Sequence, residues 1–319
     1  GGFYDVIIVG AGTAGTTLGC ELAKRGIKVL IIEKERLPRY KLCAGGVSVK
    51  AANLLDFDIS SVVEATIYGV RIAYQFGNKE TRLYHQPLAY MVMRDKFDYL
   101  LAKKAQEAST IVLDGQEVYQ IQWYSEGVSV QTPRKFFTAR IVAGADGAYS
   151  VVARSAGLMR DATLGIALQA EVGISQNKLA NWDSVVEIDI GHSPGVYGYI
   201  FLKRDHLSIG VGGTRKPSKK MRPYYQQFLA SLNLNGSKLS RPKGHLIPFR
   251  RIGMPIQRGR ALLLGDAAGL ASPLTGEGIY YAIKSAKLAA PVIIRYLEGS
   301  TPDLQDYEKT VDEQLMSGL

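Results

Sequence analysis

The stretch that decides the fold is YDVIIVGAGTAGTTLGCELAKRGIKVLIIE, residues 4–33. It begins with the apolar run Tyr4–Val9, whose continuity is typical of a central strand of a parallel sheet that is buried on both faces. Small residues and leucines at helical spacing follow over Thr16–Arg25, and Lys28–Ile32 has the apolar character of a second strand. The stretch therefore predicts a strand–turn–helix–strand unit.

The glycines of the turn and the acid that closes the unit are placed as in a dinucleotide-binding motif. Gly10 allows the tight turn, Gly12 lets the backbone approach a pyrophosphate, and Gly15 permits close packing of the helix on the strand. The N-terminus of the helix offers free N–H groups and a partial positive charge to phosphates. Glu33 stands where a carboxylate accepts hydrogen bonds from ribose hydroxyls. A glycine triplet alone would be weak evidence, but the complete unit predicts dinucleotide binding.

Length and composition indicate a globular protein with two interleaved domains. The chain has 319 residues, of which 46% are hydrophobic and 21% charged. It contains no apolar stretch of the roughly 20 residues that a membrane-spanning helix needs. The formal net charge of +10 favours anionic surfaces. Because no nucleic-acid-binding motif accompanies this charge, we interpret it as a solvated surface with some bias toward membranes.

The two cysteines, Cys20 and Cys43, exclude a disulfide framework and are too few for a protein-built metal site. We therefore expect no metal and a reducing, cytoplasmic setting. The four histidines are dispersed without ligand spacing or a visible carboxylate partner, so none is assigned a catalytic role. They are His85, His192, His206 and His245.

Strand-like runs break up the nucleotide-binding pattern and predict a second domain. Thr66–Tyr74 and Glu80–His85 read as an antiparallel pair, and Ala162–Val211 is mostly strand-like. We therefore predict an α/β protein in which a Rossmann-like domain with a parallel sheet is joined to a substrate domain with an antiparallel sheet. The first domain is expected to comprise residues 1–60, 86–160 and 250–319, and the second residues 61–85 and 161–249.

Three further motifs lie where strands are expected to end. AGADGAYSVVAR, residues 143–154, contains Asp146-Gly147, and RALLLGDAAG, residues 260–269, contains Gly265-Asp266. PLTGEG, residues 273–278, leads into the last long helix at Ile279. Ligands of doubly wound sheets bind at the carboxyl ends of the strands, so these motifs can converge with the first glycine turn on one extended ligand.

The order of these motifs resembles that of FAD-dependent enzymes built like aromatic hydroxylases, over nearly the whole chain. The resemblance implies FAD as cofactor, with the second Gly-Asp pair at its ribityl or pyrophosphate part and the later glycine loop near the flavin ring. The residues implied to bind FAD are Gly10, Gly12, Ala14, Gly15, Glu33, Lys34, Cys43, Ala44, Gly45, Arg94, Val118, Asp146, Gly147, Gly265, Asp266, Gly276, Gly278 and Ile279.

Two features are similar to one branch, the geranylgeranyl reductases. KLCAGG, residues 41–46, resembles their cysteine-glycine-glycine loop. YGYIF, residues 197–201, followed by Gly210-Val211-Gly212, resembles their signature Y-x-W-x-F-P with a later G-x-G. The chain departs from that signature, since Tyr199 and Leu202 replace the tryptophan and the proline. The resemblance implies reduction of isolated carbon–carbon double bonds in prenyl chains, in membrane lipids or on chlorophyll and quinone precursors.

Four residues are the catalytic candidates: Cys43, Tyr197, Tyr199 and Phe201. The three aromatic residues alternate along one strand and so project to one face, where they would either line an apolar tunnel or fill the core of the sheet. Cys43 lies in a glycine-rich loop with Arg39 and Lys41, which could lower its pKa. Within the resemblance it would donate a proton or position substrate, whereas a lone cysteine is otherwise usually an inert small hydrophobe, as we expect of Cys20.

The sequence therefore predicts an FAD-dependent oxidoreductase that acts on CH–CH groups of a prenyl lipid by hydride transfer from reduced flavin. NAD(P)H or a ferredoxin would supply the electrons, and peripheral membrane contact would accompany a lipid substrate. The basic run Arg215, Lys216, Lys219, Lys220 and Arg222 would be a solvated linker or a headgroup contact. Two alternatives stay open: a flavin-dependent monooxygenase or halogenase of the same fold, and a non-catalytic flavin- or lipid-binding protein.

Overall fold

The computed structural model describes residues 2–214, 218–234 and 238–316, which divide into two compact units. The first unit comprises residues 1–39, 98–163 and 248–319, and the second comprises residues 40–97 and 164–247. Arg215 and Lys216 of the basic run lie outside the described residues.

Two segments that we expected in the nucleotide-binding domain, residues 40–60 and 86–97, cluster with the second unit instead. The reason is a small antiparallel sheet of order β3-β7-β4. In it, β3 of the first segment and β4 of the second unit both pair with β7, which lies in the second segment. Its strands are β3 (Gly46–Ser48), β4 (Val63–Ile67) and β7 (Ala89–Val92).

The first unit is built on an eight-stranded sheet with the main order β18-β19-β11-β1-β2-β8. From β19 to β8 all neighbours are parallel, so these strands end at the same edge, whereas β18 pairs antiparallel with β19. β9 and β10 extend the sheet as antiparallel neighbours off β11. The strands are β1 (Phe3–Val9), β2 (Val29–Ile32), β8 (Ile111–Leu113), β9 (Gln120–Trp123), β10 (Val128–Gln131), β11 (Phe136–Gly144), β18 (Gln257–Arg258) and β19 (Ala261–Leu263).

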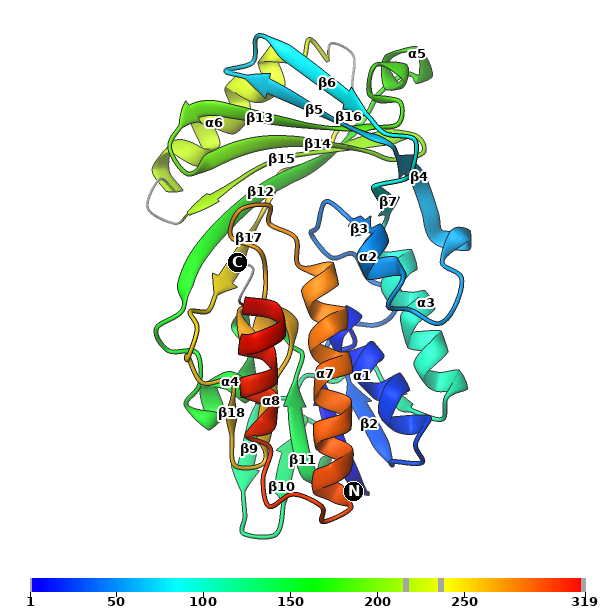
Figure 1. The fold of residues 1–319 in the computed structure, drawn as a ribbon, viewed down its shortest axis with the longest axis vertical. Helices are drawn as coiled ribbons and strands as arrows, with labels where there is room; N and C mark the ends of the chain where they lie inside the picture. Colours follow the sequence, from blue (N-terminus) through cyan, green and yellow to red (C-terminus); the bar gives the residue numbers. More distant parts are fainter. Residues whose placement is uncertain (1, 215–217, 235–237, 317–319) are drawn as a thin grey trace. The chain divides into compact units, whose positions relative to one another are not determined.

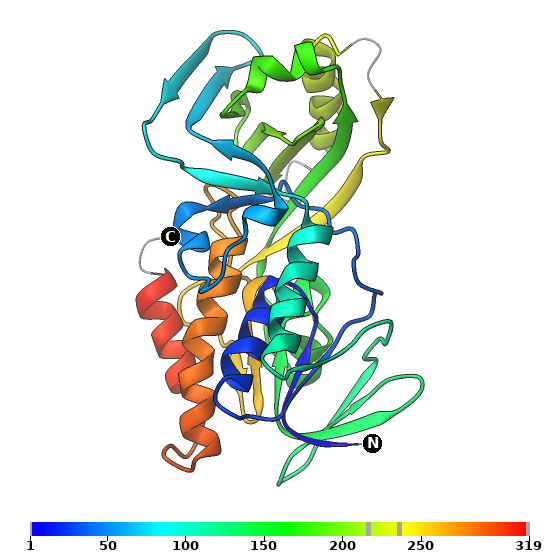
Figure 2. The same cartoon turned by 90° about the vertical axis from the view of Figure 1, so that its right-hand side faces the viewer.

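The core of the first unit lies between this sheet and the helices on it. Val6, Ile7 and Ile8 of β1 have no exposed surface, which confirms that the first apolar run is a central strand covered on both faces. Helix α1 packs against α7, and α8 packs along α7 (Figure 1). Figure 2 shows α7 in orange and α8 in red side by side from a second direction. The helices of the unit are α1 (Thr13–Ala23), α4 (Val151–Ala156), α7 (Ile279–Leu297), α8 (Asp306–Val311) and most of α3 (Arg94–Glu107).

The second unit contains another eight-stranded sheet, of main order β16-β12-β15-β14-β13-β5-β6, with β17 paired to β12. Its strands are β5 (Gly69–Tyr74), β6 (Lys79–Leu83), β12 (Thr163–Gly173), β13 (Val185–Ser193), β14 (Val196–Leu202), β15 (His206–Thr214), β16 (Lys238–Leu239) and β17 (Lys243–Phe249). The helices of the unit are α2 (Val49–Ala52), α5 (Gln176–Leu179) and α6 (Ser218–Ser231).

Thr66–Tyr74, expected as one strand, is divided at Tyr68 between β4 and β5, which belong to different sheets. The N–H groups of Tyr68 and Gly69 both donate to the carbonyl of Ser184, so the chain turns at this point onto the edge of β13. β5 then pairs antiparallel with β6, as expected, and parallel with β13.

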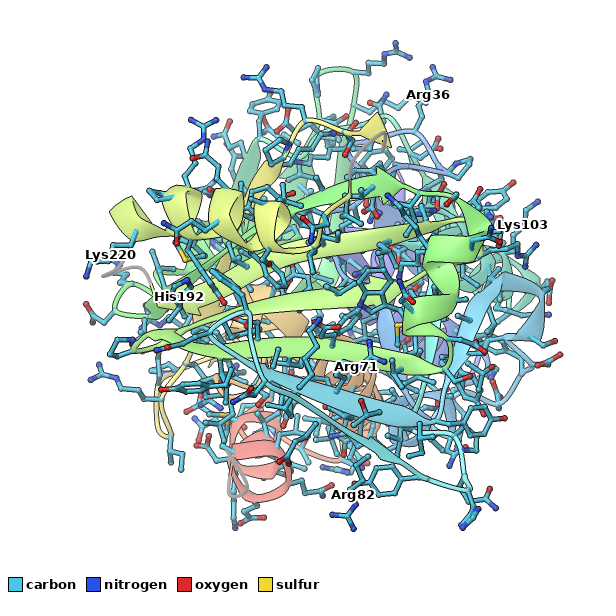
Figure 3. All side chains as sticks on the ribbon, turned by 90° about the horizontal axis from the view of Figure 1, so that it is seen from above. Arg36, Arg71, Arg82, Lys103, His192 and Lys220 are labelled. Carbon is cyan, nitrogen blue, oxygen red and sulfur yellow. The ribbon has the colours of Figure 1, made fainter. Side chains whose placement is uncertain are left out.

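Helix α6 covers one face of the larger sheet in the second unit. Its Phe228 ring lies against Gly198, where an added Cβ would be 2.8 Å from the ring. On the same face the fully buried Glu187 carboxylate binds Lys79 at 2.6 Å and Arg71 at 3.3 Å. Figure 3 looks onto this sheet and labels Arg71 there. Because both oxygens of Glu187 have cationic partners, we interpret this cluster as a satisfied structural ion pair.

The close approach of α1 to β1 yields a stability prediction. A Cβ added at Gly15 would lie 2.0 Å from the carbonyl oxygen of Gly10, a backbone atom that cannot move aside alone. We expect Gly15→Ala to lower the free energy of unfolding by about 3 kcal/mol because of this overlap.

Gly26→Ala is the matched control, because Gly26 has φ +75° but nothing within 4 Å of an added Cβ. It should cost only about 1 kcal/mol of backbone strain. Urea unfolding of both variants measures the difference, and equal losses would contradict the close-packing argument.

Candidate active site

The first glycine turn and the two Gly-Asp motifs meet at one edge of the first unit. The neighbours β1, β2, β11 and β19 are parallel and deliver Gly10, Glu33, Asp146 and Gly265 to their carboxyl ends. A Cβ on Gly10 would lie 3.0 Å from Cα of Asp146, and one on Gly265 would lie 3.4 Å from Cβ of Ala14. The sequence motifs therefore converge as we expected from parallel strand order.

Glu33 closes this turn with a buried carboxylate that is 4% exposed. Its Oε2 accepts the N–H of Ala11 at 2.8 Å, and its Oε1 accepts the N–H of Glu35 at 3.1 Å. The guanidinium of Arg39 lies 3.6 Å from Glu33 and 2.8 Å from Asp98. No sequence pattern singled out Asp98, and we expected Arg39 beside Cys43. Arg39 is instead bound by two carboxylates, which only the fold brings together.

Asp146 carries an unsatisfied buried oxygen at the end of β11. Its Oδ2 accepts the N–H of Val151 at 2.7 Å, whereas its Oδ1 is buried and has no hydrogen-bond partner among the described residues. Burial raises the pKa of this carboxyl above its usual value. An orphaned buried acceptor at the end of a strand suits a ligand hydroxyl, since such an atom otherwise costs free energy.

The later Gly-Asp motif forms a short 3₁₀ turn, Gly265–Ala268, and residues 269–278 lead from it to the start of α7. The backbone of Gly278 passes the Asp266 carboxylate so closely that an added Cβ would be 3.5 Å from Oδ1. Gly276 has φ +69°, a left-handed conformation that favours glycine. Ile279 begins α7 and is buried. The glycine loop and the Asp266 carboxylate thus lie close together.

The remaining predicted FAD contacts are placed as follows. In the first unit, Val118 is buried, Lys34 is exposed, and Gly147 has φ +75°. Gly12 is the N-terminal cap of α1 and has extended backbone angles. Cys43, Ala44, Gly45 and Arg94 belong to the second unit. Arg94 is 6% exposed at the start of α3.

The loop around Cys43 is held through three consecutive carbonyls. The carbonyl of Cys43 accepts Nε2 of Gln169 at 3.2 Å, that of Ala44 accepts Nζ of Lys203 at 2.6 Å, and that of Gly45 accepts the N–H of Val92 at 2.8 Å. The Cys43 Sγ in turn accepts the N–H of Gly45 at 3.3 Å. The orientation of the thiol is therefore fixed by the backbone of its own loop.

The aromatic signature occupies one face of β14, as the alternation predicted. The ring centroids of Tyr197 and Tyr199 are 6.2 Å apart, and those of Tyr199 and Phe201 are 5.6 Å apart. In the register of β14 and β15, Tyr199 stands opposite Gly210 and Tyr197 opposite Gly212. An added Cβ at Gly210 would be 2.3 Å from the Tyr199 ring, so the G-x-G motif makes room for the rings.

Tyr199, which replaces the tryptophan of the resembled signature, is only 7% exposed and has a polar function. Its Oη donates to Oε1 of Gln169 at 2.9 Å, and Gln169 holds the Cys43 carbonyl. Burial raises the pKa of Tyr199 well above its usual value, so it remains a neutral donor. Tyr199 thus supports the Cys43 loop through Gln169, which the sequence analysis did not single out.

Glu171 is the carboxylate at the centre of this polar network. It accepts Oη of Tyr40 at 3.2 Å and Nε2 of Gln169 at 3.0 Å, and it also accepts the hydroxyl of Ser208. Its Oε2 lies 3.3 Å from Nε2 of His206. Burial raises the pKa of Glu171, but the close contact with His206 and the hydrogen bond from Ser208 outweigh it, so the pKa lies below its usual value.

His206 corrects the expectation that no histidine has a carboxylate partner. Its Nδ1 lies 2.7 Å from Asp205 and its Nε2 faces Glu171, because the antiparallel register of β12 and β15 sets His206 beside that acid. Burial lowers the pKa of His206, but these two acids more than reverse the effect, so its pKa is raised. Asp205 directly precedes His206 in the sequence, whereas Glu171 is distant and is brought to the ring only by the strand register.

The first-unit residues fit the FAD that the sequence analysis expected. The Gly10–Gly15 contact leaves no room for a side chain in the turn, and Glu33 is buried at a strand end. The orphaned Oδ1 of Asp146 provides an acceptor for a ligand hydroxyl. Among the described residues, no group of three or more His, Cys, Asp or Glu side chains is placed to hold a metal ion.

Comparisons with known proteins agree with this geometry. Residues 3–200 match the family of FAD binding domains. An uncharacterized protein of Methanosarcina barkeri is 33% identical, with 99% of this chain and 81% of that protein covered. The chloroplastic geranylgeranyl diphosphate reductase of Oryza sativa subsp. japonica is 30% identical over 91% of this chain, which spans 66% of the length of the rice protein.

Among solved structures, the chain is similar to a geranylgeranyl bacteriochlorophyll reductase-like protein from Thermoplasma acidophilum. The TM-score is 0.89 with 26% identity, and the match covers 99% of this chain and 85% of the other. The likeness therefore extends over both compact units.

The orphaned carboxylate oxygen predicts a loss of FAD affinity. We expect Asp146→Ala to weaken FAD binding roughly tenfold or more, because one charge-assisted hydrogen bond contributes about 1.5–3 kcal/mol. Quenching of flavin fluorescence on titration into apoprotein measures the dissociation constant. Asp161→Ala, at an exposed position of the same unit, is the control, and equal affinities of the two variants would contradict a role for Asp146.

The His206–Glu171 contact predicts a pH-dependent contribution to stability. Because the pKa of His206 is raised in the folded state, its stabilising effect is complete below the unfolded pKa and is lost as pH rises through the folded pKa. We expect His206→Gln to lower the free energy of unfolding by roughly 1 kcal/mol at about pH 6, with the difference disappearing toward about pH 9.

Urea unfolding at several pH values tests this expectation. His85→Gln serves as the control, since His85 is an exposed histidine of the same unit. A difference that grows with rising pH would have the wrong sign and would contradict the assignment.

Proposed function

Because the chain belongs to the geranylgeranyl reductase family of FAD-dependent oxidoreductases, we propose that it saturates isolated carbon–carbon double bonds of a prenyl chain. The observation that carries this proposal is an apolar surface on the larger sheet of the second unit, on the face opposite helix α6. The substrate would be a prenyl lipid or a prenylated small molecule.

This apolar surface follows from the strand register. One row across the sheet runs from Gln169 through Gly210 to Tyr199 and continues with Ile188 and Ile72. The row is polar at the β12 end and apolar at the β5 end, so the two kinds of side chain are separated on one face.

Neighbouring rows extend the apolar part. Ile72 and Ile190 are 39% and 42% exposed, and Tyr74 is 54% exposed, although all three carry large apolar groups. Exposed apolar side chains that cluster on one sheet face are typical of a ligand surface. The members of the surface are Val70, Ile72, Tyr74, Val186, Ile188, Ile190, Tyr197 and Phe201.

When bound and reduced by the external reductant, the flavin would supply the hydride that adds to one carbon of the double bond. The other carbon needs a proton, for which Cys43 is the candidate donor because its Sγ is oriented by the N–H of Gly45. The rings of Tyr197 and Phe201 would stabilise cationic character on the alkene through their faces. The family resemblance supports FAD contacts of Arg94 and of the loop Cys43–Gly45 in addition to those of the strand ends.

The external reductant would be NAD(P)H or a ferredoxin, since the chain carries a single dinucleotide fingerprint. A prenyl lipid substrate would bring the protein to a membrane surface, and its net charge of +10 favours anionic headgroups. Within the described residues, no helix combines the length and apolar character needed to span a bilayer.

The test uses the FAD-loaded chain reduced chemically with dithionite, so that the natural electron donor need not be known. The probes are geranylgeranyl diphosphate, geranylgeraniol and a digeranylgeranylglycerophospholipid. Mass spectrometry should detect the gain of two hydrogen atoms per reduced bond in at least one probe. Recovery of all three unchanged, or incorporation of oxygen or halide in air, would reject the reductase in favour of one of its alternatives.

The apolar surface is tested by a charge placed on it. We expect Ile72→Asp to raise KM by roughly tenfold or more with kcat nearly unchanged, because a buried apolar contact contributes about 1–3 kcal/mol to binding. Leu83→Asp is the matched control: Leu83 is 65% exposed in the same β5–β6 hairpin, but it stands opposite Gly69 and so projects from the other face. If both variants raise KM alike, the surface is not the substrate site.

A further inference from the structure

Lys203, directly after β14, is a buried cation without a paired acid. Its side chain is 1% exposed, and it makes no ion pair with a carboxylate within 4.0 Å in the described part of the chain. Its Nζ donates only to two backbone carbonyls, of Ala44 at 2.6 Å and of Val92 at 3.1 Å. A buried ammonium with neutral acceptors alone is costly, so its retention calls for a reason beyond packing.

The two carbonyls identify what Lys203 holds. Ala44 follows Cys43 in its loop, and Val92 is the last residue of β7. Gly45 stands between them with φ +71°, and an added Cβ there would be 2.0 Å from the Val92 carbonyl and 2.9 Å from Nζ. The lysine, the loop and the strand are thus packed so closely that only a glycine fits.

We propose that Lys203 is a positioning residue of the reductase site, whose buried ammonium joins the Cys43–Gly45 loop to β7 and so determines where the Cys43 thiol stands. The inference rests on the proposed function for its effect on turnover, but the positioning of the loop can be measured without any substrate. Lys203 does not contact the reacting atoms in this account; it acts through the peptide between Ala44 and Gly45.

Because Lys203 can be charged, its hold on the loop should depend on pH, which would not be true of an uncharged side chain that only fills space. Burial lowers its pKa to about 8, and the anionic forms of Glu171, Cys43 and Glu64 partly oppose this shift. These three groups face Lys203 from β12, from the loop and from β4. Glu171 is itself bound by His206 and Ser208. The ammonium should therefore lose its proton just above neutrality, and a neutral amine would bind the two carbonyls less strongly.

The experiment compares the wild type with Lys203→Met, which removes charge and donors, and with Lys203→Arg, which stays charged at all accessible pH values. Hydrogen exchange is followed by mass spectrometry in peptides that cover residues 41–46, corrected for the intrinsic pH dependence. In the wild type, protection should fall as pH rises through about 8. Lys203→Met should exchange at least tenfold faster already at neutral pH, and Lys203→Arg should keep its protection above pH 8.

Turnover should follow the same pattern. We expect kcat of Lys203→Met to fall at least tenfold with KM nearly unchanged, and to recover partly in Lys203→Arg. Lys178→Met is the matched control, since Nζ of Lys178 also lies near a carbonyl, that of Asn233 at 3.5 Å, but in an exposed setting. It should leave both readouts as in the wild type.

Loop protection that is independent of pH in the wild type and intact in Lys203→Met would overturn the inference. The wild-type pH series needs no variant, so a variant that fails to fold does not block this test. If the wild type reduces none of the prenyl probes while its loop behaves as expected, the proposed function fails and the positioning by Lys203 stands.

Discussion

The first unit depends on the close approach of helix α1 to strand β1. At Gly15 the helix lies so near the Gly10 carbonyl that a single Cβ would overlap it, at 2.0 Å. This contact aims the N-terminus of α1 at the edge where the parallel strands end. Glu33, Asp146 and Gly265 reach the same edge through the register of β2, β11 and β19. The convergence of these residues is therefore a consequence of one packing distance and of parallel pairing.

In the second unit, the pairing of β14 with β15 plays a comparable part. Glycines stand opposite the tyrosine rings, so the rings lie flat across the neighbouring strand instead of projecting from the sheet. This leaves Tyr199 buried with its hydroxyl on Gln169, and the exposed apolar groups lie farther along the same face, on β13 and β5. The tyrosine that replaces tryptophan in the signature therefore has a structural role. Its hydroxyl donates a hydrogen bond to Gln169, and Gln169 in turn donates one to the Cys43 carbonyl.

The Cys43 loop shows how backbone carbonyls can organise a site. Gln169 of β12 and Lys203, directly after β14, supply side-chain donors, and Val92 of β7 supplies a backbone donor. The loop is held by groups that are far from it in sequence, while its own glycines allow the close approach. The Glu171 network on the same face adds a carboxylate with several donors, including His206.

The resemblance of its motifs to known proteins indicated the family. Local patterns in the sequence determined the strand–turn–helix–strand unit, the Gly-Asp motifs and the alternation of the aromatic residues. They did so because backbone conformation, apolar periodicity and strand-end chemistry act over a few neighbouring residues. The tertiary structure alone decided that Arg39 binds Glu33 and Asp98, that Lys203 binds the Cys43 loop, and that His206 meets Glu171. These contacts join residues whose distance depends on sheet order and register, and charges find partners through space without leaving a local pattern.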